Sequence, residues 1–206
     1  MKRIFLLFIL ITLVLSTNLW AGDYDFGFGI GYVSPLLNIK NIGDDFFGEG
    51  AGDEWEQIIG LHDVSGTYWI MGNARYYMGK RIALEAEVGY WTKTEKTKPG
   101  TLDFVDVNSS FKDFSIGGNL IYILRGKSYS PFAGGGVAIH FLRAKTEPIG
   151  FPEIAVDGSK NKVGLCLLGG IEIKLHQHLS IYGAGRYDYI PDWSQWKIYS
   201  GLRFHF

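Results

Sequence analysis

The chain has 206 residues, of which 47% are hydrophobic, and its formal net charge is −1 at pH 7. This balance does not indicate nucleic-acid binding, which requires a basic surface. The single cysteine, Cys166, excludes an intramolecular disulfide framework. The 28 glycines and the 16% aromatic content are both high for an ordinary globular domain.

Residues 1–21 have the pattern of a secretory signal peptide. Lys2 and Arg3 precede an apolar run from Ile4 to Leu15, and a more polar segment ends at the small residue Ala21. The apolar run is shorter than a membrane-spanning helix requires. We therefore expect the chain to be exported, with residues 22–206 forming one mature domain.

Eight later segments alternate between apolar and polar residues with period two, which predicts strands with one apolar face. The third segment is the most regular, with Leu84 and Val88 on the apolar face and Glu85 and Glu87 on the other. In chain order, the predicted strands are residues 23–33, 67–78, 81–92, 112–124, 131–143, 161–175, 178–189 and 196–206.

The predicted connections alternate between short and long. The short ones are residues 79–80, 125–130 and 176–177, and the others are residues 34–66, 93–111, 144–160 and the shorter 190–195. Tight turns on one side and long loops on the other indicate an up-and-down arrangement of hairpins. An even number of strands places both ends of the mature chain on the side of the short turns.

The last segment places Ile198, Leu202, Phe204 and Phe206 on one face. A strand of about 9–11 residues suits a tilted crossing of the hydrocarbon layer. Such a strand, ending in Phe, resembles the closing strand of bacterial outer-membrane β-barrels. The mature chain as a whole resembles the small OmpA-, OmpX- and OmpW-like barrels.

This resemblance implies a single eight-stranded antiparallel up-and-down transmembrane β-barrel in the outer membrane of a Gram-negative bacterium. It also implies that Leu202, Phe204 and Phe206 form the signal that the barrel assembly machinery reads. Lipid would then surround the apolar face, and lipopolysaccharide would lie beside the outer end.

The charged residues of the strands fall mainly on the face opposite the apolar one, which favours a membrane barrel over a soluble, lipocalin-like barrel with an apolar lumen. Because side chains fill an eight-stranded barrel, we interpret these charges as packed ion pairs. The alternative is a narrow pore in which the same charges select ions or small solutes. The predicted lumen charge network comprises Arg75, Glu85, Glu87, Glu172, Lys174, Arg186, Lys197 and Arg203.

A lipid-modifying enzyme is a third possibility, which would need a His and a Ser together at the outer rim. Only His178-Leu179-Ser180 has a suitable spacing, but it falls at the turn side and faces the lumen. His176 and His178 alone make a weak metal site. We therefore assign no catalytic residue, metal or cofactor.

The first long loop is acidic, with carboxylates at Asp44, Asp45, Glu49, Asp53, Glu54, Glu56 and Asp63. The spacing of an EF-hand is absent. We interpret the segment as a solvated surface loop, and the alternative is a Ca²⁺-bridged contact with lipopolysaccharide phosphates or a partner. The sequence thus predicts a structural or interaction protein of the outer membrane, whose external partner it does not identify.

Overall fold

The structure is a computed structural model that describes residues 24–37, 42, 44, 65–97, 107–149 and 155–206. The predicted signal peptide and nearly all of the acidic loop lie outside the described residues.

Across the part of the chain that the structure describes, no helix is both long and apolar enough to cross a bilayer.

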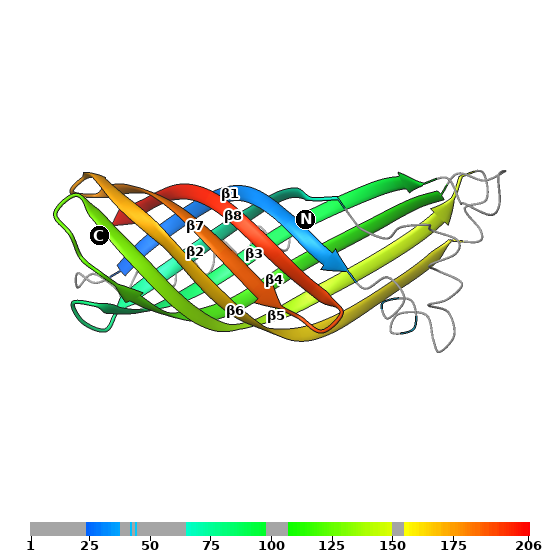
Figure 1. Cartoon of the computed structure of the whole chain (residues 1–206), viewed down its shortest axis with the longest axis horizontal. Coiled ribbons are helices and arrows are strands. Elements are labelled where there is room, and N and C mark those ends of the chain that lie inside the picture. The colour runs from blue at the N-terminus through cyan, green and yellow to red at the C-terminus, as the bar shows by residue number, and fades with distance from the viewer. Residues whose placement is uncertain (1–23, 38–41, 43, 45–64, 98–106, 150–154) are drawn as a thin grey trace.

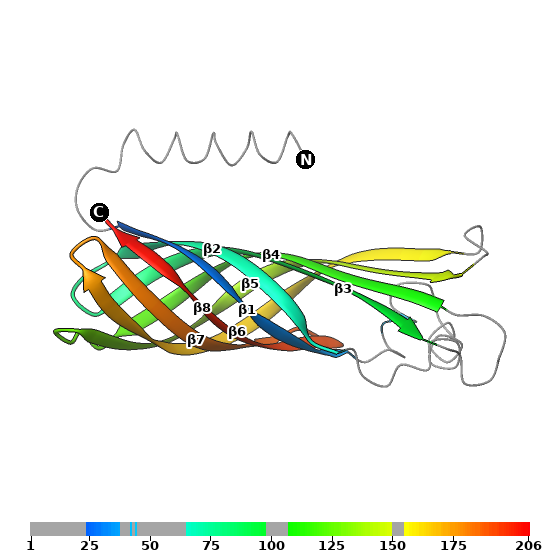
Figure 2. The ribbon, with the colours of Figure 1, turned by 90° about the horizontal axis from the view of Figure 1, so that it is seen from above.

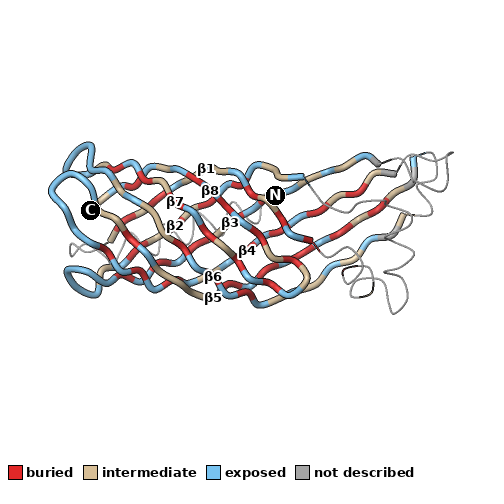
Figure 3. The backbone as a smooth tube through the Cα atoms, viewed as in Figure 1, coloured by how far each residue is buried: buried red, intermediate tan, exposed pale blue. Residues whose placement is uncertain are grey.

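The predicted fold is confirmed: eight antiparallel strands form a closed barrel in which each strand pairs with its neighbours in sequence and β1 pairs with β8 (Figure 1). Buried and exposed residues alternate along the strands, as period two requires (Figure 3). The strands are β1 (Tyr24–Leu37), β2 (Thr67–Tyr77), β3 (Ile82–Thr97), β4 (Val107–Ile123), β5 (Tyr129–Pro148), β6 (Val156–His176), β7 (Leu179–Tyr189) and β8 (Trp193–His205).

Six strands are longer than the sequence pattern predicted, and the predicted connections 34–66, 93–111, 144–160 and 190–195 were partly wrong. β1 continues to Leu37 and β8 begins at Trp193, and the largest additions are in β3 to β6. β3 continues past residue 92 and β5 past residue 143, while β4 begins before residue 112 and β6 before residue 161. These added segments project beyond the rest of the barrel at the end opposite the C-terminus (Figure 2). They escaped the prediction because polar residues occupy both of their faces, which hides the period of two. We call residues 93–97, 107–112, 143–148 and 156–162 the extension.

The two ends of the barrel differ. The short connections after β2, β4 and β6 lie at the same end as the C-terminus, which we call the turn end (Figure 1). The extension marks the opposite, loop end. Outer-membrane barrels place short turns in the periplasm and long connections outside the cell. On the resemblance to these barrels, we expect the extension to face the outside of the cell.

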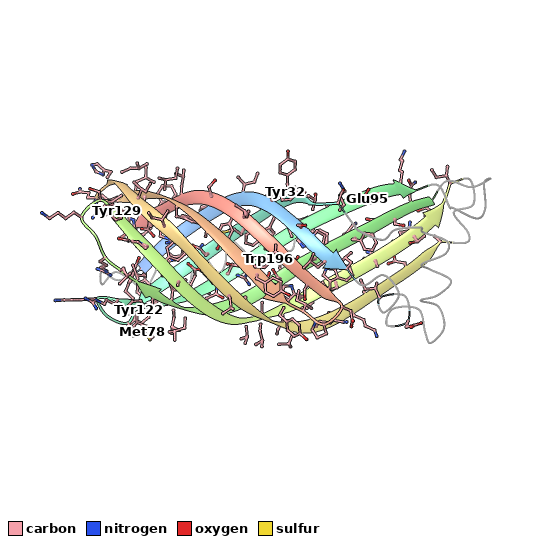
Figure 4. All side chains as sticks on the ribbon, in the orientation of Figure 1. Tyr32, Met78, Glu95, Tyr122, Tyr129 and Trp196 are labelled. Atoms are coloured by element: carbon pink, nitrogen blue, oxygen red, sulfur yellow. The ribbon has the colours of Figure 1, made fainter. Side chains whose placement is uncertain are left out.

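The outer wall is an apolar band between aromatic residues. Leu120 is 53% exposed and Leu167 is 70% exposed on this wall, as expected for side chains that meet lipid. Tyr122 and Tyr129 lie near the turn end, and Tyr32 and Trp196 lie farther toward the loop end (Figure 4). Aromatic girdles of this kind mark the two membrane–water interfaces.

Candidate functional site

The lumen is the candidate site, and toward its turn end four charged side chains form a cluster. Arg75 from β2 lies 2.9 Å from Glu85 of β3 and 3.4 Å from Glu172 of β6. Arg203 from β8 lies 3.2 Å and 2.5 Å from the same two carboxylates. Each arginine therefore bridges both carboxylates, and the charges balance. We call Arg75, Glu85, Glu172 and Arg203 the turn-end cluster.

A second balanced cluster lies nearer the loop end. Arg186 lies 2.5 Å from both Glu87 and Asp188, and Lys197 lies 2.7 Å from Asp188. The Lys197 ammonium also lies 4.4 Å from the centre of the Trp69 ring. All four charged side chains are at most 2% exposed. We call Glu87, Arg186, Asp188 and Lys197 the central cluster.

The structure therefore brings seven of the eight predicted lumen charges together in two clusters and places the eighth elsewhere. Lys174 is exposed, at a point where the pairing of β6 with β7 shifts register before the turn. Asp188, in contrast, was absent from the predicted network although it belongs to the central cluster. Its position two residues after Arg186 on β7, and therefore on the same face, was the signal that identifies it.

Aromatic rings cover the central cluster on its loop side. The centre of the Trp193 ring lies 6.2 Å from that of Trp91 and 6.0 Å from that of Phe111. The Trp91 indole donates a 2.8 Å hydrogen bond to the Gln195 carbonyl oxygen. All three aromatic side chains are at most 1% exposed. Sequence reasoning did not identify this layer, which we call the aromatic plug (Trp91, Phe111 and Trp193).

A polar chain runs beside the aromatic plug. The Gln195 amide donates a 2.8 Å hydrogen bond to Asp113, and the other contact of that carboxylate is His140, with Nδ1 2.9 Å away. The same amide lies 3.4 Å from Asp188 of the central cluster. The plug and the central cluster are therefore linked, and His140 and Asp113 are fully enclosed.

At the turn end, three residues from different strands form a hydrogen-bonded chain. Ser180 Oγ lies 2.6 Å from His205 Nε2, and His205 Nδ1 lies 2.8 Å from Asp25. The Tyr77 hydroxyl donates a hydrogen bond to the second oxygen of Asp25. The predicted neighbour, His178, contacts the backbone carbonyl of His205 and not Ser180. The structure therefore pairs Ser180 with a histidine from β8 that local spacing could not reveal.

The predicted assembly residues lie on the outward face of β8 or directly after it. Leu202, Phe204 and Phe206 are 44%, 40% and 73% exposed. The Phe206 ring packs edge-on against Phe26 of β1, and its backbone N–H lies 3.3 Å from the Tyr24 carbonyl oxygen. The chain end therefore lies along the seam where the first and last strands close the barrel.

No protein-family model matches the sequence, and no curated protein matches it. Solved structures do share the fold. Neisserial surface protein A is 16% identical over 89% of this chain and 97% of its own, with a TM-score of 0.56. The outer membrane protein OprG of Pseudomonas aeruginosa is 15% identical over 90% and 96% of the two chains, with a TM-score of 0.58.

The attachment invasion locus protein Ail of Yersinia pestis, solved with the heparin analogue sucrose octasulfate, is also similar. It is 14% identical over 89% of this chain and 99% of its own, with a TM-score of 0.53. At these identities the likeness concerns the fold. The chain thus has the fold of these small eight-stranded outer-membrane barrels.

Proposed function

We propose that the chain is a structural and interaction protein of the outer membrane whose lumen is sealed. The observation that supports this is the succession of closed layers along the axis: the turn-end cluster, the central cluster and the aromatic plug. Each charged layer is internally neutral and almost fully enclosed. Buried charges that are paired in this way resist separation, because an unpaired partner would remain in the interior.

Planar-bilayer recording of the refolded full chain tests the sealed lumen. We expect no discrete conductance steps from protein whose heat-modifiable gel mobility shows that it is folded. The matched comparison is Trp91→Ala, which removes part of the aromatic plug but leaves both ion-pair clusters in place, and it should also be silent. Regular steps from the parent protein would contradict the proposal.

A narrow pore is the second candidate, favoured by the charges of both signs inside the barrel. Glu87 Oε2 and His140 Nε2 have no hydrogen-bond partner among the described residues. Such groups could contact a passing ion or solute. If the lumen is a pore, the parent protein gives conductance steps, and these steps are less selective for cations in the Glu87→Gln variant. If the lumen is sealed, neither protein gives steps.

We also propose that the Ser180–His205–Asp25 chain is structural. The order of the groups is that of a hydrolase triad. However, Ser180 is only 1% exposed, and Glu172 lies 3.4 Å from the same His205 nitrogen that faces the serine. A fluorophosphonate probe should therefore leave the folded protein unlabelled. Labelling that Ser180→Ala abolishes would instead establish an accessible nucleophile.

The outward face of the extension is the proposed contact with lipopolysaccharide. Lys112 and Arg143 lie directly opposite each other, two residues beyond the aromatic pair Phe114 and Phe141. Like charges in this arrangement repel, and Asp157 already pairs with Arg143, so a further anion beside Lys112 would reduce the remaining repulsion. A hydrogen bond from Arg143, with the positive charges of Lys145 and Lys112, holds the pKa of Asp157 below its ordinary value.

The amount of lipopolysaccharide that the purified protein retains tests this contact. Lys112→Gln combined with Lys145→Gln should retain several-fold less of it than the parent, because two cations near the phosphates are lost. The control pair, Lys127→Gln with Lys174→Gln, removes the same charge from the turn end. Equal retention by the two double variants would argue against the contact.

A further inference from the structure

Among the residues that the structure describes, the three turns at the turn end of the barrel carry exposed charged side chains of one sign. The exposed charged side chains of its three turns are Lys80, Arg81, Arg125, Lys127 and Lys174. Two carboxylates of the strands at this end, Asp25 and Glu172, point into the lumen and are paired there. Among the described residues of these turns there is no exposed carboxylate side chain. The described surface of these three turns is therefore basic.

Two of these turns line an open hollow of about 360 Å³. It lies between the β2–β3 and β4–β5 connections, which β3 and β4 hold side by side. Its lining residues are Lys80, Arg81, Leu124 and Arg125. Three of the four are cations, so the hollow concentrates the positive charge of this end.

Contacts with tyrosines anchor the two arginines of the hollow. Arg81 Nη1 lies 3.3 Å from the Tyr122 hydroxyl. The Arg125 guanidinium lies 4.8 Å from the centre of the Tyr77 ring. Since a guanidinium has five N–H donors, each arginine still has donors to offer to a ligand. Two anchored guanidinium groups suit a phosphate, whose oxygens can accept hydrogen bonds in pairs.

The hollow also borders the lipid-facing wall. Leu124 is 53% exposed, and Tyr122, on the same face of β4, is 45% exposed. Tyr122 and Met78 lie at this end of the barrel in Figure 4. A ligand bound to the arginines would therefore also contact the part of the wall that faces the lipid acyl chains. The site combines cations with an apolar wall at the membrane interface, which is the environment of a phospholipid headgroup.

We infer that this hollow binds the phosphate of an anionic glycerophospholipid in the leaflet at the turn end. The arginines bind the phosphate oxygens, Lys80 adds positive charge, and an acyl chain lies along Leu124. Bound lipid would fix the depth of the turn end in the membrane. This inference requires only the transmembrane fold and is independent of whether the lumen conducts.

Native mass spectrometry tests this inference. The full chain is released from nanodiscs of phosphatidylethanolamine that contain a minority of phosphatidylglycerol. The parent should retain phosphatidylglycerol in preference to phosphatidylethanolamine. Arg81→Gln combined with Arg125→Gln should retain about tenfold less phosphatidylglycerol. Lys127→Gln, which removes a cation from the β4–β5 turn but does not line the hollow, should behave as the parent. Heat-modifiable mobility confirms that each variant is folded.

Three outcomes would overturn the inference. One is equal retention by the parent and the double arginine variant. Another is a loss in Lys127→Gln as large as in the double variant, because diffuse charge would then account for binding. In the third, inorganic phosphate displaces phosphatidylglycerol from the detergent-solubilised protein at equal concentration. That result would show that the acyl wall contributes nothing and that the site takes free phosphate.

Discussion

At the scale of single residues, the lumen depends on matching each buried cation with a carboxylate. Arg203 contacts both Glu85 and Glu172, so its removal would leave negative charge enclosed beside Arg75 alone. We expect Arg203→Gln to lower the free energy of unfolding by about 3–5 kcal/mol. Lys174→Gln, at an exposed position on β6, should change it by less than about 0.5 kcal/mol. Urea unfolding of both variants in the same lipid gives the comparison, and equal stabilities would show that the turn-end cluster contributes little.

Glycines on the lumen face leave space for the aromatic side chains that fill the barrel. A Cβ atom at Gly89 would lie 2.6 Å from the Trp69 indole nitrogen and 3.1 Å from Ser115 Oγ. Gly89→Ala should therefore lower the free energy of unfolding by about 1–3 kcal/mol through overpacking. Gly118→Ala is the control, since nothing lies within 4 Å of a Cβ there. A loss in Gly118→Ala as large as in Gly89→Ala would contradict this packing argument.

At the scale of elements, a single strand passes through two environments. Val88 lies midway along the membrane part of β3, on its outward face, and Thr94 lies on the same face within the extension. Val88→Arg should cost about 2–4 kcal/mol, because it places a charge in lipid near the midplane. Thr94→Arg should be nearly neutral in water. The folded fraction after refolding into lipid vesicles measures the effect of both substitutions. An equal loss at the two positions would show that the membrane boundary does not lie between Val88 and Thr94.

The extension also shows what strand pairing adds beyond the membrane. The outward face of the extension is polar, so contact with lipid does not stabilise it. Backbone hydrogen bonds and the packing of inward side chains keep β3 to β6 paired there. Phe111 and Ala144 lie buried on that inner side, each 0% exposed. The Asp157–Arg143 ion pair joins β5 and β6 on the outer side. This four-stranded sheet gives the barrel a structured outer surface that short loops would not provide.

At the scale of the whole molecule, closure depends on the seam between β1 and β8. Phe206 packs on Phe26 across this seam, whereas Phe204 pairs with Phe26 within the ladder. We propose that the assembly machinery reads Phe206 first, and that an unclosed barrel would expose unpaired N–H and C=O groups to lipid. Phe206→Ser should therefore reduce the heat-modifiable protein in the outer-membrane fraction more than Phe204→Ser does. Unchanged amounts in Phe206→Ser would refute both the closure and the recognition argument.

Much of this architecture follows from local sequence. Period two in segments such as 81–92 identifies the strands and separates the lipid face from the lumen face, because side chains of a strand alternate between its two sides. Short turns such as residues 79–80 fix neighbours as antiparallel hairpins. The strands, their antiparallel order and the inward position of Arg75, Glu85 and Glu87 were therefore predictable from local sequence, whereas the closed eight-stranded barrel was expected from the resemblance to outer-membrane barrels.

Tertiary structure alone decided which inward residues meet. Arg75 reaches Glu172, 97 positions away, and His205 reaches Asp25, 180 positions away. These pairs depend on the register and tilt of strands that are not neighbours in sequence, and a period-two pattern carries no information about either. The same holds for Trp91 above the central cluster and for the extension, where polar residues on both faces conceal the strand. The sequence determined which face each side chain occupies, and the closure of the barrel determined its partners.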